Sequence, residues 1–162
     1  YKSFVEEASF SMVAAPKQKG LDYSLMKTKI KGKGIKGLSS SVIYGPNAAG
    51  KTNIIGAMDV LRAIVLRGNI RNSEEKSSPN PAASALELIP NNNESEPKPV
   101  CFEIEFYEED GEEHKFKIHY ELQIDLGTFL EEEYQRKILA EVLEVNGERV
   151  FETGIYRYHG NR

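Results

Sequence analysis

The sequence predicts a mixed α/β fold with α+β character, and three observations predict it. Residues 45–52 match the pattern G-x-x-x-x-G-K-[ST]. The segment after them repeats apolar residues at helical spacing, and residues 100–153 alternate apolar and polar residues with a period of two, as antiparallel strands do. We therefore expect a strand, a glycine-rich loop and a helix, followed by β-hairpins.

The glycine-rich loop reads Gly-Pro-Asn-Ala-Ala-Gly-Lys-Thr, the phosphate-binding P-loop pattern. Its two glycines let the backbone curl so that successive N–H groups point at phosphate oxygens. Lys51 would reach the β- and γ-phosphates, and the Thr52 hydroxyl would ligate Mg²⁺. A turn that merely joins a strand to a helix is the alternative. The residues expected at the nucleotide are Gly45, Asn47, Ala48, Ala49, Gly50, Lys51, Thr52 and Asn53, with Thr52 as the metal ligand.

The flanks of the loop match the order strand, loop, helix. Val42-Ile43-Tyr44 is predicted to be the end of a buried strand. A helix is predicted from about Thr52 to Arg67, with Gly68 as its C-cap. Its expected apolar face consists of Ile54, Met58, Leu61 and Val65.

The N-terminal part contains a predicted strand at Phe10 to Val13 and a basic tract from Leu25 to Lys36. Such a tract could meet nucleic-acid phosphates. A solvated hairpin or loop is the preferred interpretation, because glycines interrupt the lysines and leave no packed basic face. The lysines are Lys27, Lys29, Lys31, Lys33 and Lys36.

Three regions are expected within one domain: a P-loop core at 1–68, an insertion at 69–99 and an antiparallel β region at 100–158. The insertion holds five of the seven prolines, and we expect a partly mobile surface segment there. The β region predicts two hairpins, which turn at Asp110-Gly111 and Asn146-Gly147. In the first hairpin, Glu103 and Glu105 are expected to pair with Lys115 and Lys117.

Composition further limits the class of protein to which the chain can belong. Of 162 residues, 40% are hydrophobic and 28% charged, as in a soluble globular protein, and no segment is apolar enough to predict a membrane span. The single cysteine, Cys101, excludes an internal disulfide and suits a reducing cytoplasm. The chain starts at Tyr1 without an initiator Met and ends at Arg162 just after a strand pattern, so we expect a fragment.

Four segments together carry a resemblance to a protein family: Lys2-Ser3-Phe4, Phe10-Ser11-Met12, Ile43 to Asn53 and Phe102 to Phe106. The chain resembles prokaryotic AAA15/AAA21-type, abortive-infection-like ATPases within the SMC, RecF and OLD group of ABC-type ATPases. The Gly-Pro-Asn form of the loop and Asn53 after the threonine are similar to that group. The order of the elements, with antiparallel hairpins after the P-loop helix, also fits the first lobe of an ABC-type head better than a nucleotide kinase or a GTPase.

The resemblance implies a head that binds ATP and Mg²⁺ and pairs with a second ATPase head, as a homo-oligomer. It further implies a nuclease or toxin partner, with DNA as another candidate partner, in antiphage defence or DNA repair. The chain departs from the family in lacking a Leu-Ser-Gly-Gly signature and a Walker B run. We therefore expect no catalytic residue in this fragment. The fragment alone would bind ATP without hydrolysing it, whereas the complete protein would be an ATPase.

The other residues that could carry chemistry are better explained as ordinary structural or solvent-exposed residues. His114, His119 and His159 have no metal-ligand spacing, and the run Glu131-Glu132-Glu133 fits a solvated turn. Cys101 has no basic neighbour to activate it as a nucleophile. Tyr156 and Tyr158 fit a terminal strand better than a base-stacking platform. Two alternatives to the ATPase head stay open: a regulatory module that binds nucleotide without turnover, and, with less support, a P-loop kinase.

Overall fold

The structure is a computed structural model that describes residues 4–16, 20, 22–70, 98–110, 114–127 and 136–154. A short 3-10 turn, η1 (Asp22–Ser24), precedes the strands β1 (Leu25–Ile30) and β2 (Lys33–Leu38). The helix α1 (Lys51–Arg67) follows. Four strands complete the described elements: β3 (Val100–Glu109), β4 (Lys115–Asp125), β5 (Lys137–Val145) and β6 (Glu148–Gly154). This composition confirms a mixed α/β fold with antiparallel sheets.

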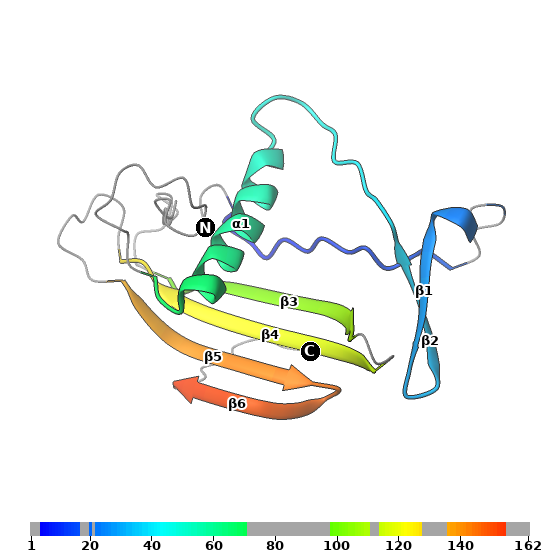
Figure 1. The fold of residues 1–162 in the computed structure, drawn as a ribbon. Coiled ribbons are helices and arrows are strands. Elements are labelled where there is room, and N and C mark those ends of the chain that lie inside the picture. Colours follow the sequence, from blue (N-terminus) through cyan, green and yellow to red (C-terminus); the bar gives the residue numbers. More distant parts are fainter. Residues whose placement is uncertain are drawn as a thin grey trace.

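The larger sheet has the order β3-β4-β5-β6, and every pair is antiparallel (Figure 1). Both predicted hairpins are present. Asn146 and Gly147 turn the second one with φ of 56° and 80°, which is the left-handed backbone of the tight two-residue turn that suits the twist of paired strands. Local turn signals therefore predict the pairing of β3 with β4 and of β5 with β6.

One face of the sheet packs against α1, as Figure 1 shows at β3 and β4. The core joins apolar side chains of α1 to alternate residues of the two strands. Leu122 and Ile124 at its centre are fully buried. The core residues are Val60, Leu61, Ile64, Ile70, Val100, Phe102, Tyr120, Leu122, Ile124 and Leu126.

The predicted boundaries of α1 are confirmed, but its predicted apolar face is wrong in part. Gly68 ends the helix with φ of 66°, and its N–H donates to the Ile64 carbonyl over 2.9 Å. Val60 and Ile64 are buried beside Leu61, whereas Met58 and Val65 are 48% and 55% exposed. The helix carries apolar residues on both sides, so periodicity alone could not choose the side that faces the sheet.

The basic tract forms the predicted hairpin, because Lys31 and Gly32 adopt φ of 47° and 80° between β1 and β2. The register places Lys27 opposite Lys36 and on one face with Lys29. All three are exposed, and Lys27 pairs with Asp22 over 2.9 Å, as the preferred interpretation of a solvated hairpin expects. β1 lies beside β4, and the Lys31 ammonium group donates to the Asn146 carbonyl over 2.9 Å.

Two predicted N-terminal strands do not form as expected. Phe10 to Val13 contributes only an isolated antiparallel bridge between Val13 and Gly37. Val42 to Tyr44 is not a strand, and Val42 and Tyr44 are 83% and 90% exposed. A buried strand needs a hydrogen-bonded neighbour, and in the described part of the chain no strand lies alongside residues 42–44. The apolar run therefore leads to the loop as extended chain.

On the outer face of the sheet, one predicted ion pair is confirmed and the other is wrong. The Lys117 Nζ lies 2.7 Å from a Glu105 carboxylate oxygen. Lys115 instead pairs with Glu109 over 3.3 Å, because the register places those two residues directly opposite. Within the described residues, no helix is long and apolar enough to cross a membrane.

Several predictions fall outside the described residues. They concern most of the insertion at 69–99, the run Glu131-Glu132-Glu133 and the terminal residues Tyr156, Tyr158 and His159.

Candidate functional site

The glycine-rich loop runs from Gly45 directly into the first residue of α1. Ala48 has φ of 63° and Gly50 has φ of 84°, so two loop positions hold the left-handed conformation that reverses the backbone. The Ala49 N–H donates to the Pro46 carbonyl over 3.4 Å within the loop. Glycine at position 50 meets the conformational requirement of this turn at no steric cost.

Lys51, the first residue of α1, folds back across the loop. Its Nζ lies 2.9 Å from the Gly45 carbonyl oxygen and 2.6 Å from that of Pro46. In the described part of the chain both acceptors of this ammonium group are neutral carbonyls, not carboxylates. No acidic side chain among the described residues neutralises this positive charge, and an anion could exchange with the carbonyls.

The N-terminus of α1 is also suited to an anion. Gly50 supplies no side-chain cap, and the first turn of the helix contains no acidic residue. The N–H groups of Lys51 and Thr52 have no acceptor within the helix, while the Asn53 N–H reaches the Gly50 carbonyl over 3.0 Å. The positive end of the helix dipole thus points toward the same loop that holds the Lys51 ammonium group.

The structure brings together every residue that the sequence predicts at the nucleotide. Gly45, Asn47, Ala48 and Ala49 lie in the exposed loop, and Gly50 to Asn53 span its junction with α1. The Thr52 side chain is exposed on the first helical turn. The donor set fits a triphosphate with Mg²⁺: backbone N–H groups, an ammonium group and one hydroxyl.

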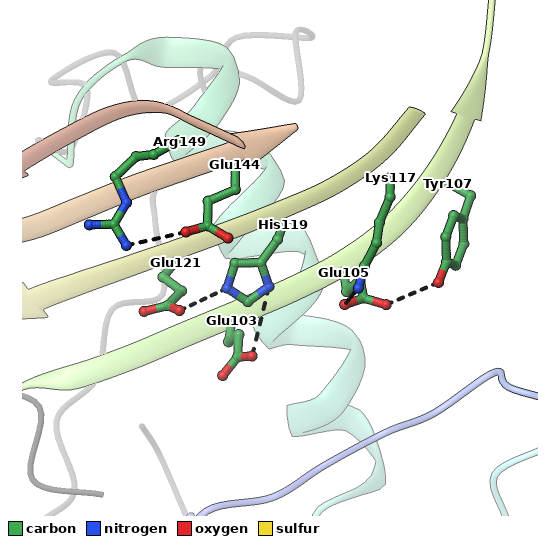
Figure 2. A network of polar contacts seen from close by, with 8 residues as sticks. All are labelled: Glu103, Glu105, Tyr107, Lys117, His119, Glu121, Glu144 and Arg149. Carbon is green, nitrogen blue, oxygen red and sulfur yellow. Dashed lines mark hydrogen bonds and ion pairs between the residues drawn. The ribbon is translucent and has the colours of Figure 1, made fainter. Parts of the chain in front are cut away.

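A second group of side chains lies on the sheet face opposite α1, as Figure 2 shows. His119 lies between two glutamates, with Nε2 2.7 Å from a Glu121 oxygen and Nδ1 3.9 Å from a Glu103 oxygen. Sequence spacing missed this cluster because its members lie on two strands. The predicted turn at Asp110-Gly111 could have indicated this cluster, but only together with the exact register of the two strands.

Cys101 lies on the same face as Glu103, two residues earlier on β3. Cys101 is exposed, yet partial desolvation by its neighbours raises the pKa of its thiol, and the negative charge of Glu121 raises that pKa further. A raised pKa lowers the fraction of thiolate, which is the nucleophilic form.

Comparison with known proteins gives one match. Residues 40–160 match the model of a family described as "AAA domain, putative AbiEii toxin, Type IV TA system". The match spans most of the chain and includes the loop, α1 and the four-stranded sheet. The chain belongs to this AAA domain family. No curated protein and no solved structure matches it.

Family membership indicates the general function of the chain. AAA domains are nucleotide-binding domains of the P-loop ATPase class, so the chain is a nucleotide-binding protein of the ATP-binding type. The family implies a nucleotide and Mg²⁺ as ligands.

Proposed function

We propose that the chain is the first lobe of an ABC-type ATPase head, which binds ATP and Mg²⁺ at residues 45–53. The backbone N–H groups of Asn47 to Thr52 hold the phosphates, Lys51 binds the β- and γ-phosphate oxygens, and Thr52 ligates the metal. Bound ATP supplies the phosphate charge and the hydrolysable γ-phosphate. The finer assignment to the SMC, RecF and OLD group rests on the resemblance in sequence.

The observation that carries the proposal is the position of the Lys51 ammonium group. It contacts two carbonyl oxygens at 2.9 and 2.6 Å and no carboxylate in the described residues. The bonds from the ammonium group to these carbonyls are already charge-assisted, and phosphate oxygens would add the attraction between opposite charges. This position of the Lys51 ammonium group at the glycine-rich loop supports a phosphate site there.

The place of α1 supports the assignment to a head lobe. One side of the helix covers the antiparallel sheet, while Ile55 and Leu66 are 57% and 64% exposed. A helix that is apolar on both sides is usually buried on both sides. This fits a head lobe in which α1 packs on both sides.

The biological role is proposed from the family's description, which names the AbiEii toxin and a type IV toxin–antitoxin system. In this proposal, ATP drives pairing of two heads, and the pairing controls a nuclease or toxin partner in antiphage defence or DNA repair. DNA is a further proposed partner. A regulatory module that binds ATP without turnover is the second candidate, because the loop at residues 45–53 contains no carboxylate that could orient an attacking water.

Sedimentation of the full-length protein tests the proposal. Millimolar ATP with Mg²⁺ should shift the monomer to a dimer, and Lys51→Ala should abolish the shift. Lys29→Ala, which removes an exposed lysine on β1, is the matched control and should dimerise normally. A sedimentation coefficient unaffected by ATP would reject the paired head. Dimerisation without release of phosphate would favour the regulatory module over the ATPase.

A further inference from the structure

The outer face of the β3–β4 hairpin brings two like charges together. Glu103 and Glu121 are directly opposite in the register, and side chains of such a pair project from the same face. Two carboxylates in this position repel each other unless a positive group lies between them. His119 is two residues from Glu121 on β4, so it shares the face, and Figure 2 shows its ring between the two glutamates.

The three side chains offer a compact set of donor atoms. One ligand atom from each of Glu103, His119 and Glu121 can be chosen so that all three lie within 4.8 Å of one another. Both ring nitrogens of His119 face a carboxylate, at 2.7 Å for Nε2 and 3.9 Å for Nδ1.

One ion can bind only one ring nitrogen of His119, so both carboxylates must reach the ion on that side of the ring. Zinc ligands lie about 2.0–2.2 Å from the ion, so two ligands in a tetrahedral site are roughly 3.4 Å apart. With Nε2 as the ligand, its 2.7 Å contact with Glu121 would open slightly, and Glu103 would rotate from the Nδ1 side to the same ion. The Glu103 side chain is 64% exposed, whereas His119 is 21% and Glu121 26% exposed. Side-chain rotation of the exposed glutamate therefore closes the site without moving the strands.

The basic side chains on this face are engaged with other carboxylates. Lys117 binds Glu105 over 2.7 Å, and Arg149 binds Glu144 over 3.2 Å. In the described part of the chain, the one basic side chain that reaches Glu103 is that of His119, at 3.9 Å. The negative charge of Glu103 is thus left to the histidine or to a cation from solution.

We propose that Glu103, His119 and Glu121 bind one divalent transition-metal ion of the zinc type. Each glutamate contributes a carboxylate oxygen and His119 contributes a ring nitrogen, with water completing the coordination. An imidazole with two carboxylates suits zinc better than Mg²⁺ or Ca²⁺, which prefer oxygen ligands alone. The ion would join β3 to β4 on the sheet face opposite α1, separate from the nucleotide loop.

Calorimetric titration of ZnCl₂ into the metal-free full chain, without nucleotide, tests the proposal. The titration uses a Cys101→Ser background so that the thiol cannot capture zinc. We expect one ion per chain. Glu103→Gln and His119→Asn should each weaken binding at least tenfold, since each removes a ligand. Glu121→Gln should weaken it as well.

The matched control is His114→Asn. His114 also contacts a carboxylate, with Nδ1 3.0 Å from Asp110, but no third metal-ligating side chain completes a group there among the described residues. Its zinc affinity should stay within twofold of the parent. Circular dichroism without metal checks that each variant is folded. Because the Glu103 side chain is largely exposed, Glu103→Gln keeps the test decisive even if His119→Asn fails to fold. Unchanged zinc affinity in Glu103→Gln, or no binding by the parent at millimolar zinc, would overturn the proposal.

Discussion

The Nζ of Lys51 lies 2.6 Å from the carbonyl oxygen of Pro46, near the start of the glycine-rich loop. A long, flexible side chain from the start of α1 is thereby folded onto the loop that precedes it. A lysine in this position is a compact cation with three donors, which can pass from carbonyl to phosphate oxygens by small rotations. The geometry explains why the charge is placed at the loop rather than in solvent.

The core should depend strongly on Leu122, which is fully buried at the centre of the sheet. Leu122→Ala removes apolar contacts and leaves a cavity under α1, so the free energy of unfolding should fall by about 2–5 kcal/mol. Urea denaturation followed by circular dichroism measures the change. Val150→Ala on β6, where the side chain is 58% exposed, is the control and should change it by less than about 0.5 kcal/mol. Equal effects at the two sites would contradict the assigned core.

The stability of the C-terminal end of α1 should depend on glycine at position 68. Its φ of 66° is left-handed, and a Cβ added there would meet no atom within 4 Å, so Gly68→Ala carries a purely conformational cost. We expect a loss of about 1–2 kcal/mol in the free energy of unfolding. Gly34→Ala has equal space around the Cβ without a left-handed φ, and it should be close to neutral. A loss as large at Gly34 as at Gly68 would argue against the cap.

Tyr120 should make stability depend on alkaline pH. Burial raises the pKa of its phenol, and the hydrogen bond to Glu141, 2.6 Å long, raises that pKa further. The folded-state pKa exceeds the unfolded value of about 10, so the contribution is present below pH 10 and is lost as pH rises beyond it.

Urea denaturation between pH 8 and pH 11 measures this effect in the wild type and in Tyr120→Phe. The variant should be less stable by about 1–3 kcal/mol at pH 8, because the Glu141 carboxylate loses its donor, and its stability should fall less above pH 10. Tyr23→Phe, at a side chain that is 86% exposed, should behave as the wild type does. An alkaline fall of the same size in Tyr120→Phe would show that Tyr120 is not its source.

Features set by local sequence could be predicted. The turn at Asn146-Gly147, the alternation of β3 and β4 and the glycine cap of α1 depend on neighbouring residues alone. The residues of the glycine-rich loop are contiguous, so their motif predicted the whole candidate nucleotide site.

Features that depend on distant partners could not be predicted. Val42 to Tyr44 has strand composition, yet a strand forms only beside another strand. The side of α1 that faces the sheet was ambiguous because Met58 and Val65 are as apolar as Val60 and Ile64. Predicting that Glu103 lies close to His119 required the register of β3 and β4. A one-residue slip in that register would place the two side chains on opposite faces of the sheet.

The central claim is that the loop at residues 45–53 binds ATP with Mg²⁺, and calorimetric titration of the full-length protein tests it most directly. The wild type should bind one ATP per chain. Lys51→Ala should bind roughly ten- to a hundredfold more weakly, from the loss of charge-assisted bonds of about 1.5–3 kcal/mol, while Lys29→Ala should bind normally. The absence of ATP binding by the wild type, or equal affinity in Lys51→Ala, would contradict the account.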